Sequence, residues 1–337
     1  MSSLTNTLPP IKTVIAFGDS ITDVGNTKAV SGVPPSPYFN GRFSNGPVWV
    51  EYLSGYLSNA TLYDFAYGGA CALESANAKC EGLSFLLPDL AGQYKLYAKS
   101  PSSKADPAST LFTVMAGGND LSYSNTTSAE ASAGAVVAMV SKLLSSGAKR
   151  VLVSNMWWVA PKVTTFNAAL NSGIASLRAA NPTATIQLHD MLKFFTYAVS
   201  PAGSAAFGFK NTVDTCLTGD WSTTVEAVCA EPNTYLRWDV SHPTTRTHDL
   251  IAQFAFNELN GVDAFLISEP SPSSSATVVS SVTSTLATAG SSTSAGSAAN
   301  GASGATSVPT APANIYSSGS SAVALSIVGA FLSFLTI

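Results

Sequence analysis

The chain has 337 residues, of which only 11% are charged, and its formal net charge is −4. A chain of this length can build one domain of roughly 250 residues with its own core. Because no basic stripe is available to hold a phosphate backbone, the composition argues against nucleic acid as a partner.

The first twelve residues form a short lead without an apolar run, so no signal peptide is visible in residues 1–12. We expect the natural start to lie upstream, because other features described below suit a secreted protein. The predicted globular domain covers residues 13–267.

The first predicted strand, residues 13–17, ends in Gly18-Asp19-Ser20. Ligands of open parallel sheets bind beyond the carboxyl ends of the strands, so Ser20 stands where a nucleophile would be needed. Asp19 and Ser20 could instead only form a turn and cap a helix, which such pairs often do after a strand.

The next two predicted strands also end in glycine-containing segments that could donate hydrogen bonds. Residues 61–65 lead to Gly68-Gly69, and residues 110–115 lead to Gly118-Asn119. A backbone N–H and a side-chain amide in these places could stabilise an oxyanion. Either segment alone is weak support, because glycine-rich loops after strands are common turns.

Strands and helices alternate through the rest of the domain, which predicts an α/β fold with a mostly parallel sheet covered on both faces. The further expected strands are 150–154 and 185–189, and the expected helices are 128–146, 164–180 and 245–260.

The four cysteines form two locally spaced pairs, Cys71 with Cys80 and Cys216 with Cys229. Close pairs in an even number suit two disulfides made in an oxidising compartment, although four reduced core thiols are the alternative. Two sequons, beginning at Asn59 and Asn125, are compatible with secretion as a glycoprotein.

The strongest chemical pattern is Asp239 followed three residues later by His242. One turn can place the carboxylate against the imidazole, and a serine nucleophile needs a base oriented in this way. The other two histidines, His189 at a strand end and His248 in a helical stretch, are expected to be structural.

Beyond the predicted domain, residues 268–320 are rich in Ser, Thr, Ala and Gly, which predicts a disordered stalk. Residues 321–337 are apolar and uncharged and follow small residues such as Asn300 and Ser303, the layout of a GPI-attachment signal. A tail-anchored membrane helix is the alternative, but the run is short for a span and lacks a basic flank.

Taken together, residues 13–262 resemble the SGNH/GDSL hydrolase superfamily, and in particular secreted fungal GDSL acetylesterases and lipases. The resemblance implies that Ser20 is the nucleophile, that His242 is the general base and that Asp239 orients it. It assigns the oxyanion hole to Ser20, Gly69 and Asn119, although Gly68 stands where many relatives have serine. It also implies a three-layer flavodoxin-like fold with about five parallel strands and no metal or organic cofactor.

The expected activity is ester hydrolysis, by a monomer that meets a membrane only through its GPI anchor or tail. Acetyl or other short acyl groups, carried by carbohydrate, form the first substrate hypothesis, with Trp49, Trp157, Trp158 and Tyr38 as an aromatic platform. Residues 41–46 and Trp49 also resemble a segment that shapes the site entrance in this branch. A lipase for longer acyl chains and an inactive surface or cell-wall protein are the alternatives, and the latter disagrees with the intact set of catalytic groups.

Overall fold

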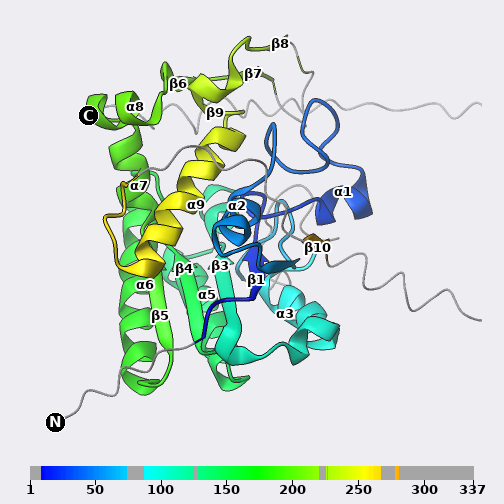
Figure 1. The fold of residues 1–337 in the computed structure, drawn as a ribbon, viewed down its shortest axis with the longest axis vertical. Coiled ribbons are helices and arrows are strands. Elements are labelled where there is room, and N and C mark those ends of the chain that lie inside the picture. The colour runs from blue at the N-terminus through cyan, green and yellow to red at the C-terminus, as the bar shows by residue number, and fades with distance from the viewer. Residues whose placement is uncertain are drawn as a thin grey trace, which may run out of the picture. The chain divides into compact units, whose positions relative to one another are not determined.

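Six parallel strands form the central sheet in the order β10-β2-β1-β3-β4-β5 (Figure 1). The computed structural model describes residues 9–73, 87–123, 127–219, 225, 227–266 and 278–280. The strands are β1 (Thr13–Gly18), β2 (Thr61–Asp64), β3 (Thr110–Met115), β4 (Arg150–Ser154), β5 (Thr185–His189) and β10 (Val278–Ser280). All the described residues belong to one compact unit, residues 1–287.

Helices cover both faces of the sheet. Alternate strand residues point to opposite sides, so apolar side chains on each face must be buried. Val14 and Ala16 of β1 pack on one side, while Ile15 and Phe17 pack on the other. The first face is covered by α2 (Trp49–Tyr56), α7 (Met191–Ala198), α8 (Pro201–Phe207) and α9 (Thr245–Asn260). The second is covered by α3 (Leu90–Lys99), α5 (Ala129–Ser145) and α6 (Pro161–Ala180).

Short helices, 3-10 turns and two small ribbons connect the main elements. The short helices are α1 (Asn26–Ser31), α4 (Gly118–Tyr123), and the 3-10 turns η1 (Pro101–Lys104), η2 (Pro107–Ser109) and η3 (Pro232–Thr234). Two small ribbons pair β6 (Asn211–Thr215) with β9 (Tyr235–Arg237), and β7 (Leu217–Thr218) with β8 (Ala227–Val228).

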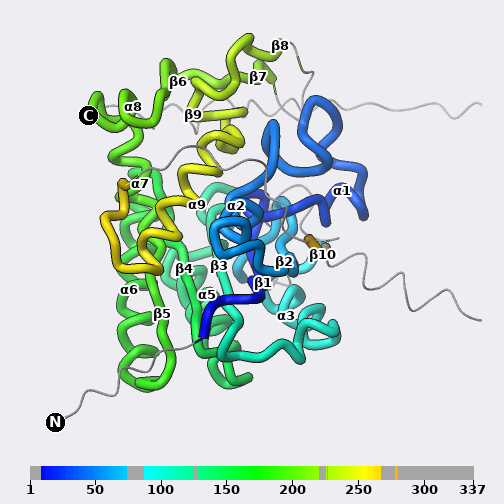
Figure 2. The backbone as a smooth tube through the Cα atoms, viewed as in Figure 1, coloured from blue at the N-terminus to red at the C-terminus, as the bar shows by residue number. Residues whose placement is uncertain are grey.

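Two helices that are far apart in the chain, α2 and α9, contact each other. Helix α9 begins where Thr244 accepts a hydrogen bond from the Thr247 N–H, a common way for a helix to start. It packs beside α2, so a late segment of the chain covers an early one (Figure 2). The backbone N–H of Trp49, in α2, donates to His248 Nδ1 of α9 at 3.2 Å.

The predicted α/β class, parallel sheet and five strands are confirmed, and the sheet has one further strand. Val278–Ser280 pairs with β2 in parallel, inside a range expected to be a disordered stalk. Residues 278–280 therefore form a strand, where the sequence predicted a disordered stalk. Two valines within a Ser/Thr-rich segment are too few to predict a strand. The rest of the predicted stalk and the whole apolar tail lie outside the described residues, within which no helix is long and apolar enough to cross a membrane.

Candidate active site

The end of β1 places Ser20 at the carboxyl edge of the sheet. A Cβ atom on Gly18 would lie 2.3 Å from the Met115 carbonyl oxygen, so only glycine fits here without a shift of β3. Gln93, from α3, accepts a hydrogen bond from the Gly18 N–H at 2.9 Å and donates to its carbonyl at 2.8 Å. These contacts fix the turn that leads to Ser20.

Ser20, His242 and Asp239 form one continuous hydrogen-bonded chain. The Ser20 Oγ lies 2.9 Å from His242 Nε2, and His242 Nδ1 lies 2.8 Å from both carboxylate oxygens of Asp239. With Nδ1 facing a carboxylate, the neutral imidazole keeps its proton there and presents Nε2 as an acceptor. This geometry suits removal of the Ser20 proton.

Asp239 is held as a buried anion. Its Oδ1 accepts the backbone N–H groups of Ser241 and His242, each at 2.8 Å, and its Oδ2 accepts from the Tyr38 hydroxyl at 2.6 Å. Burial acts to raise the Asp239 pKa, but the His242 charge and these hydrogen bonds outweigh it, so the pKa is lowered. The carboxylate therefore stays ionised beside the imidazole.

Three donors stand at the ends of β1, β2 and β3, where an oxyanion hole is expected. Asp23 Oδ2 accepts the Gly68 N–H at 2.9 Å, whereas the N–H groups of Gly69 and Ser20 donate to no described residue. The geometry thus favours Gly69 over Gly68. Asn119 Nδ2 donates one hydrogen to the Ala70 carbonyl at 2.7 Å, which orients the amide and leaves its second hydrogen.

Two buried carboxyl groups are neighbours of these donors in the chain, since Asp19 precedes Ser20 and Asp120 follows Asn119. Burial raises the pKa of Asp19 to about 7, partly offset by the Ile21 N–H and the His242 charge. Burial also raises the pKa of Asp120, whose carboxylate accepts the N–H groups of Ala72 and Leu73. The Asp19 carboxyl therefore keeps its proton to a higher pH than an exposed aspartate does.

The aromatic platform expected from the sequence is only partly present. Trp49 is 0% exposed and its indole donates to Thr22, so it supports the core and offers no surface to a substrate. Tyr38 is also buried, against Asp239. Trp157 is half-buried and stacks on Phe195. Trp158 is half-buried beside Gly118, the residue before the candidate oxyanion donor Asn119.

The two other histidines lie in the core, as their sequence positions indicated. His189 is 0% exposed and contacts Glu258 at 2.7 Å through Nδ1. Burial lowers the pKa of His248 to about 3, and the His242 charge adds to the effect. A group that stays neutral in this way cannot act as a protonated acid at neutral pH.

One of the two predicted disulfides is present among the described residues. Cys216 and Cys229 are joined with a Cα–Cα distance of 4.8 Å. Cys80 and Asn125 lie outside the described residues, so the Cys71–Cys80 bridge and the second sequon stay predictions.

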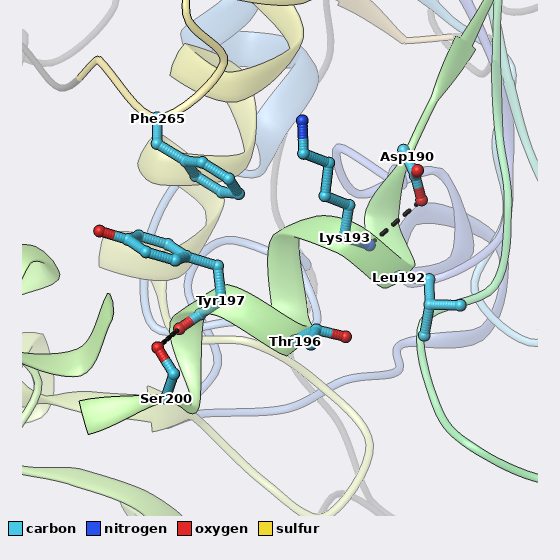
Figure 3. A pocket seen from close by; sticks show the side chains of 7 residues that line it. All are labelled: Asp190, Leu192, Lys193, Thr196, Tyr197, Ser200 and Phe265. Carbon is cyan, nitrogen blue, oxygen red and sulfur yellow. Dashed lines mark hydrogen bonds between the residues drawn. The ribbon is translucent and has the colours of Figure 1, made fainter. Parts of the chain in front are cut away.

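An open cavity of about 500 Å³ is lined by residues of α7, by those that flank this helix and by Phe265 (Figure 3). The Tyr197 and Phe265 rings approach to 4.1 Å between centroids, and the Lys193 ammonium lies 5.3 Å from the Phe265 ring. None of the residues that line this cavity belongs to the catalytic set.

The sequence did not indicate the supporting roles of three residues, one of which, Tyr38, was expected in the aromatic platform instead. Gln93 holds the nucleophile turn, Asp23 holds Gly68, and Tyr38 holds Asp239. Each contact joins residues at least 45 positions apart, so no local motif could have revealed it. Only the amide and acid residue types hinted at buried hydrogen bonds.

Comparison with known proteins gives one consistent family. The family model described as GDSL-like lipase/acylhydrolase matches residues 14–255. A crystal structure of a member of the lipolytic protein G-D-S-L family from Veillonella parvula has a TM-score of 0.38 at 17% identity, covering 71% of this chain and 93% of that chain.

Similar curated proteins come from bacteria and plants. Thermolabile hemolysin of Vibrio parahaemolyticus is 29% identical over 283 residues, covering 75% of this chain and 65% of that protein. Phosphatidylcholine-sterol acyltransferase of Aeromonas hydrophila is 30% identical over 154 residues, covering 44% and 45%. Acetylajmalan esterase 2 of Rauvolfia serpentina is 24% identical over 331 residues, covering 74% and 91%. The chain thus spans less than two thirds of both bacterial relatives.

Proposed function

This chain belongs to the GDSL-like lipase/acylhydrolase family, and from that membership we propose that it hydrolyses carboxylic esters through an acyl-enzyme on Ser20. The observation that carries the proposal is the hydrogen-bonded chain from Ser20 through His242 to Asp239, with distances of 2.9 and 2.8 Å. The inactive surface protein is disfavoured, because the chain has a candidate for each group that acyl transfer needs.

The proposed reaction has two halves. Ser20 Oγ attacks the ester carbonyl while its proton passes to His242 Nε2, and the oxyanion accepts hydrogen bonds from Ser20, Gly69 and Asn119. The alcohol leaves with that proton. Water then attacks the acyl-enzyme with His242 again as base, the bond from Ser20 Oγ to the acyl carbon breaks, and His242 returns the proton to Ser20 as the carboxylic acid leaves. Because only the neutral imidazole can take the Ser20 proton, the rate should rise with pH and then level off.

The test compares Ser20→Ala with Ser145→Ala, a matched serine removal at the exposed end of α5. Turnover of p-nitrophenyl acetate should disappear in Ser20→Ala, with unchanged circular dichroism, and persist in Ser145→Ala. A folded Ser20→Ala protein with wild-type esterase activity would refute the proposed function.

Two substrate classes have specific support. Short acyl groups, including acetyl groups on carbohydrate, are favoured by the motif resemblance to secreted fungal acetylesterases and by similarity to an acetylajmalan esterase. Lipid esters are favoured by similarity to a hemolysin and a phosphatidylcholine-sterol acyltransferase. Exposed apolar side chains next to site segments, Phe39, Val159 and Val240, add to the second class. Rates on a series of p-nitrophenyl esters and on acetylated oligosaccharides distinguish them.

We also propose that the enzyme is a secreted, monomeric glycoprotein held at the cell surface by GPI. The support is the apolar run of residues 321–337 behind small residues near Asn300 and Ser303, and the locally paired cysteines. Phosphatidylinositol-specific phospholipase C should release the enzyme from cells that make it with a signal peptide. An intact peptide ending at Ile337 in the mature, membrane-bound enzyme would contradict the anchor.

A further inference from the structure

Tyr38 contacts the catalytic carboxylate from a part of the chain that no catalytic motif covers. Its hydroxyl donates to Asp239 Oδ2 at 2.6 Å across 201 residues of sequence, and the side chain is 4% exposed. The distance is typical of a charge-assisted O–H···O⁻ bond, which is stronger than one between neutral groups.

We propose that Tyr38 is a positioning residue of the active site, extending the Ser20–His242–Asp239 chain to a fourth member that acts through the Asp239 carboxylate. This role deepens the proposed function and rests on it. Tyr38 does not touch the reacting atoms: it sets the orientation and the charge of the group that orients the general base.

Aromatic packing holds the Tyr38 ring in place. The ring meets Trp238 edge to face, with centroids 6.0 Å apart and an interplanar angle of 87°, and meets Phe43 at 6.4 Å and 67°. Phe43 in turn lies 5.1 Å from the His242 ring, centroid to centroid. Pairs at such distances and angles are favourable beyond simple burial, so the ring has a defined orientation.

The same segment of the chain is fastened to both halves of the site. Ser44 Oγ donates to the Pro243 carbonyl at 2.9 Å, and Asn45 Oδ1 accepts the Thr245 N–H at 2.8 Å. The Phe43 ring occupies the space where a Cβ on Gly68 would lie, 2.1 Å from its nearest carbon. Movement of Tyr38 is therefore coupled to the loop that carries Asp239 and His242.

The electrostatic effect of the Tyr38 hydroxyl has a definite sign. By donating to Oδ2, the hydroxyl draws negative charge away from the carboxylate and weakens its attraction for the protonated imidazole. Without it, the attraction between the Asp239 carboxylate and the protonated imidazole should be stronger. Among the described residues, Asp19 and His248 also interact electrostatically with His242.

The experiment compares Tyr38→Phe with Tyr235→Phe. Tyr235 is the matched control, because it packs in the same cluster with Trp238 and Cys216 and its hydroxyl bonds to no described residue. We expect Tyr38→Phe to lower kcat about tenfold with KM unchanged, the usual scale for one hydrogen bond to a charged group. The midpoint of the rising limb of its pH–rate profile should move to higher pH. Tyr235→Phe should show neither effect.

Two further measurements separate this role from a purely structural one. In an Asp239→Asn background, Tyr38→Phe should change kcat far less than in the wild type, because the hydroxyl acts through the carboxylate. The downfield proton resonance of His242 Nδ1–H should shift in Tyr38→Phe, a readout that needs no turnover.

A kcat within twofold of wild type, or a pH profile that stays in place or moves to lower pH, would overturn the role of Tyr38. The proposed function would still stand in either case, because it depends on Ser20→Ala. A folded, fully active Ser20→Ala protein would remove the proposed function, and the Nδ1–H resonance would still report on the Tyr38 contact.

Discussion

At the scale of single residues, Asn119 offers a clean test of oxyanion stabilisation. Its amide is oriented by the Ala70 carbonyl at 2.7 Å, so the second hydrogen is already directed before a substrate binds. Asn119→Ala should lower kcat by about 10²-fold with little change in KM, because the donor matters most once the oxyanion forms. Asn171→Ala, an exposed position on α6, is the control. A loss confined to KM would remove Asn119 from the oxyanion hole.

The raised pKa of Asp19 predicts how the free energy of unfolding depends on pH. Its pKa is raised from 3.8 to about 7, so between these values the native state keeps a proton that the unfolded chain has released. Stability from this group is complete below the lower value and is lost as pH rises through the upper one. Burial of His248 has the opposite sign, since its pKa is lowered and its stabilising effect is lost as pH falls.

Asp19→Asn should therefore change the pH dependence of the unfolding free energy. Relative to wild type, the variant should gain about 1.4 kcal/mol for each pH unit between about pH 4.5 and about pH 6. The amide can still accept the Ile21 N–H, which limits local disturbance. Urea unfolding at several pH values measures the difference, and parallel curves for the two proteins would contradict the raised pKa.

The sequence indicated the proposed catalytic groups more readily than the residues that support them. Asp239 and His242 lie three residues apart, so their contact is local and readable. Tyr38, by contrast, meets Asp239 only through the tertiary fold. Trp49 was misread for a related reason: an aromatic side chain carries no sign of burial until its neighbours are known.

At the scale of elements, long buried strands and amphipathic helices could be predicted, and short paired segments could not. The expected strands at 110–115, 150–154 and 185–189 and the helix at 245–260 agree with the structure residue by residue. Continuous apolar runs between turns are typical of strands covered on both faces. Strands β7, β8 and β10 have two or three residues, so their pairing depends on partners elsewhere in the chain.

The β7–β8 ribbon ties a disulfide to the catalytic segment. Cys216 N–H donates to the Arg237 carbonyl and Leu217 N–H to the Trp238 carbonyl, immediately before Asp239. Replacing Cys216 and Cys229 by serine should lower the unfolding free energy by at most about 3 kcal/mol, the scale for a loop of this length. It should lower kcat less than tenfold, because Asp239 keeps its own hydrogen bonds.

Chemical denaturation and steady-state kinetics of this double variant give both quantities. Reduction of the wild-type enzyme by dithiothreitol is a second route to the same state. A double variant with wild-type stability would show that the ribbon is held by its other contacts alone.

At the scale of the whole molecule, we predict a glycan on Asn59, on the side of the sheet opposite to the triad. Asn59 is exposed in the turn before β2, at the amino ends of the strands, whereas the triad lies at the carboxyl ends. PNGase F should lower the mass of the secreted protein by removing its N-linked glycans. Asn59→Gln should abolish the part of this mass change that comes from the Asn59 glycan, and its kcat/KM should stay within about twofold of wild type. A secreted protein whose peptide around Asn59 carries no glycan would refute it.

Ser20 and His242 are 222 residues apart, and α2 is covered by α9. During synthesis, the nucleophile turn leaves the ribosome long before its base, and a nascent chain that ends ahead of α9 has an open apolar face on α2. Pairings over such distances form late, because a long loop must close first. The proposed catalytic groups therefore cannot assemble until most of the chain has been made.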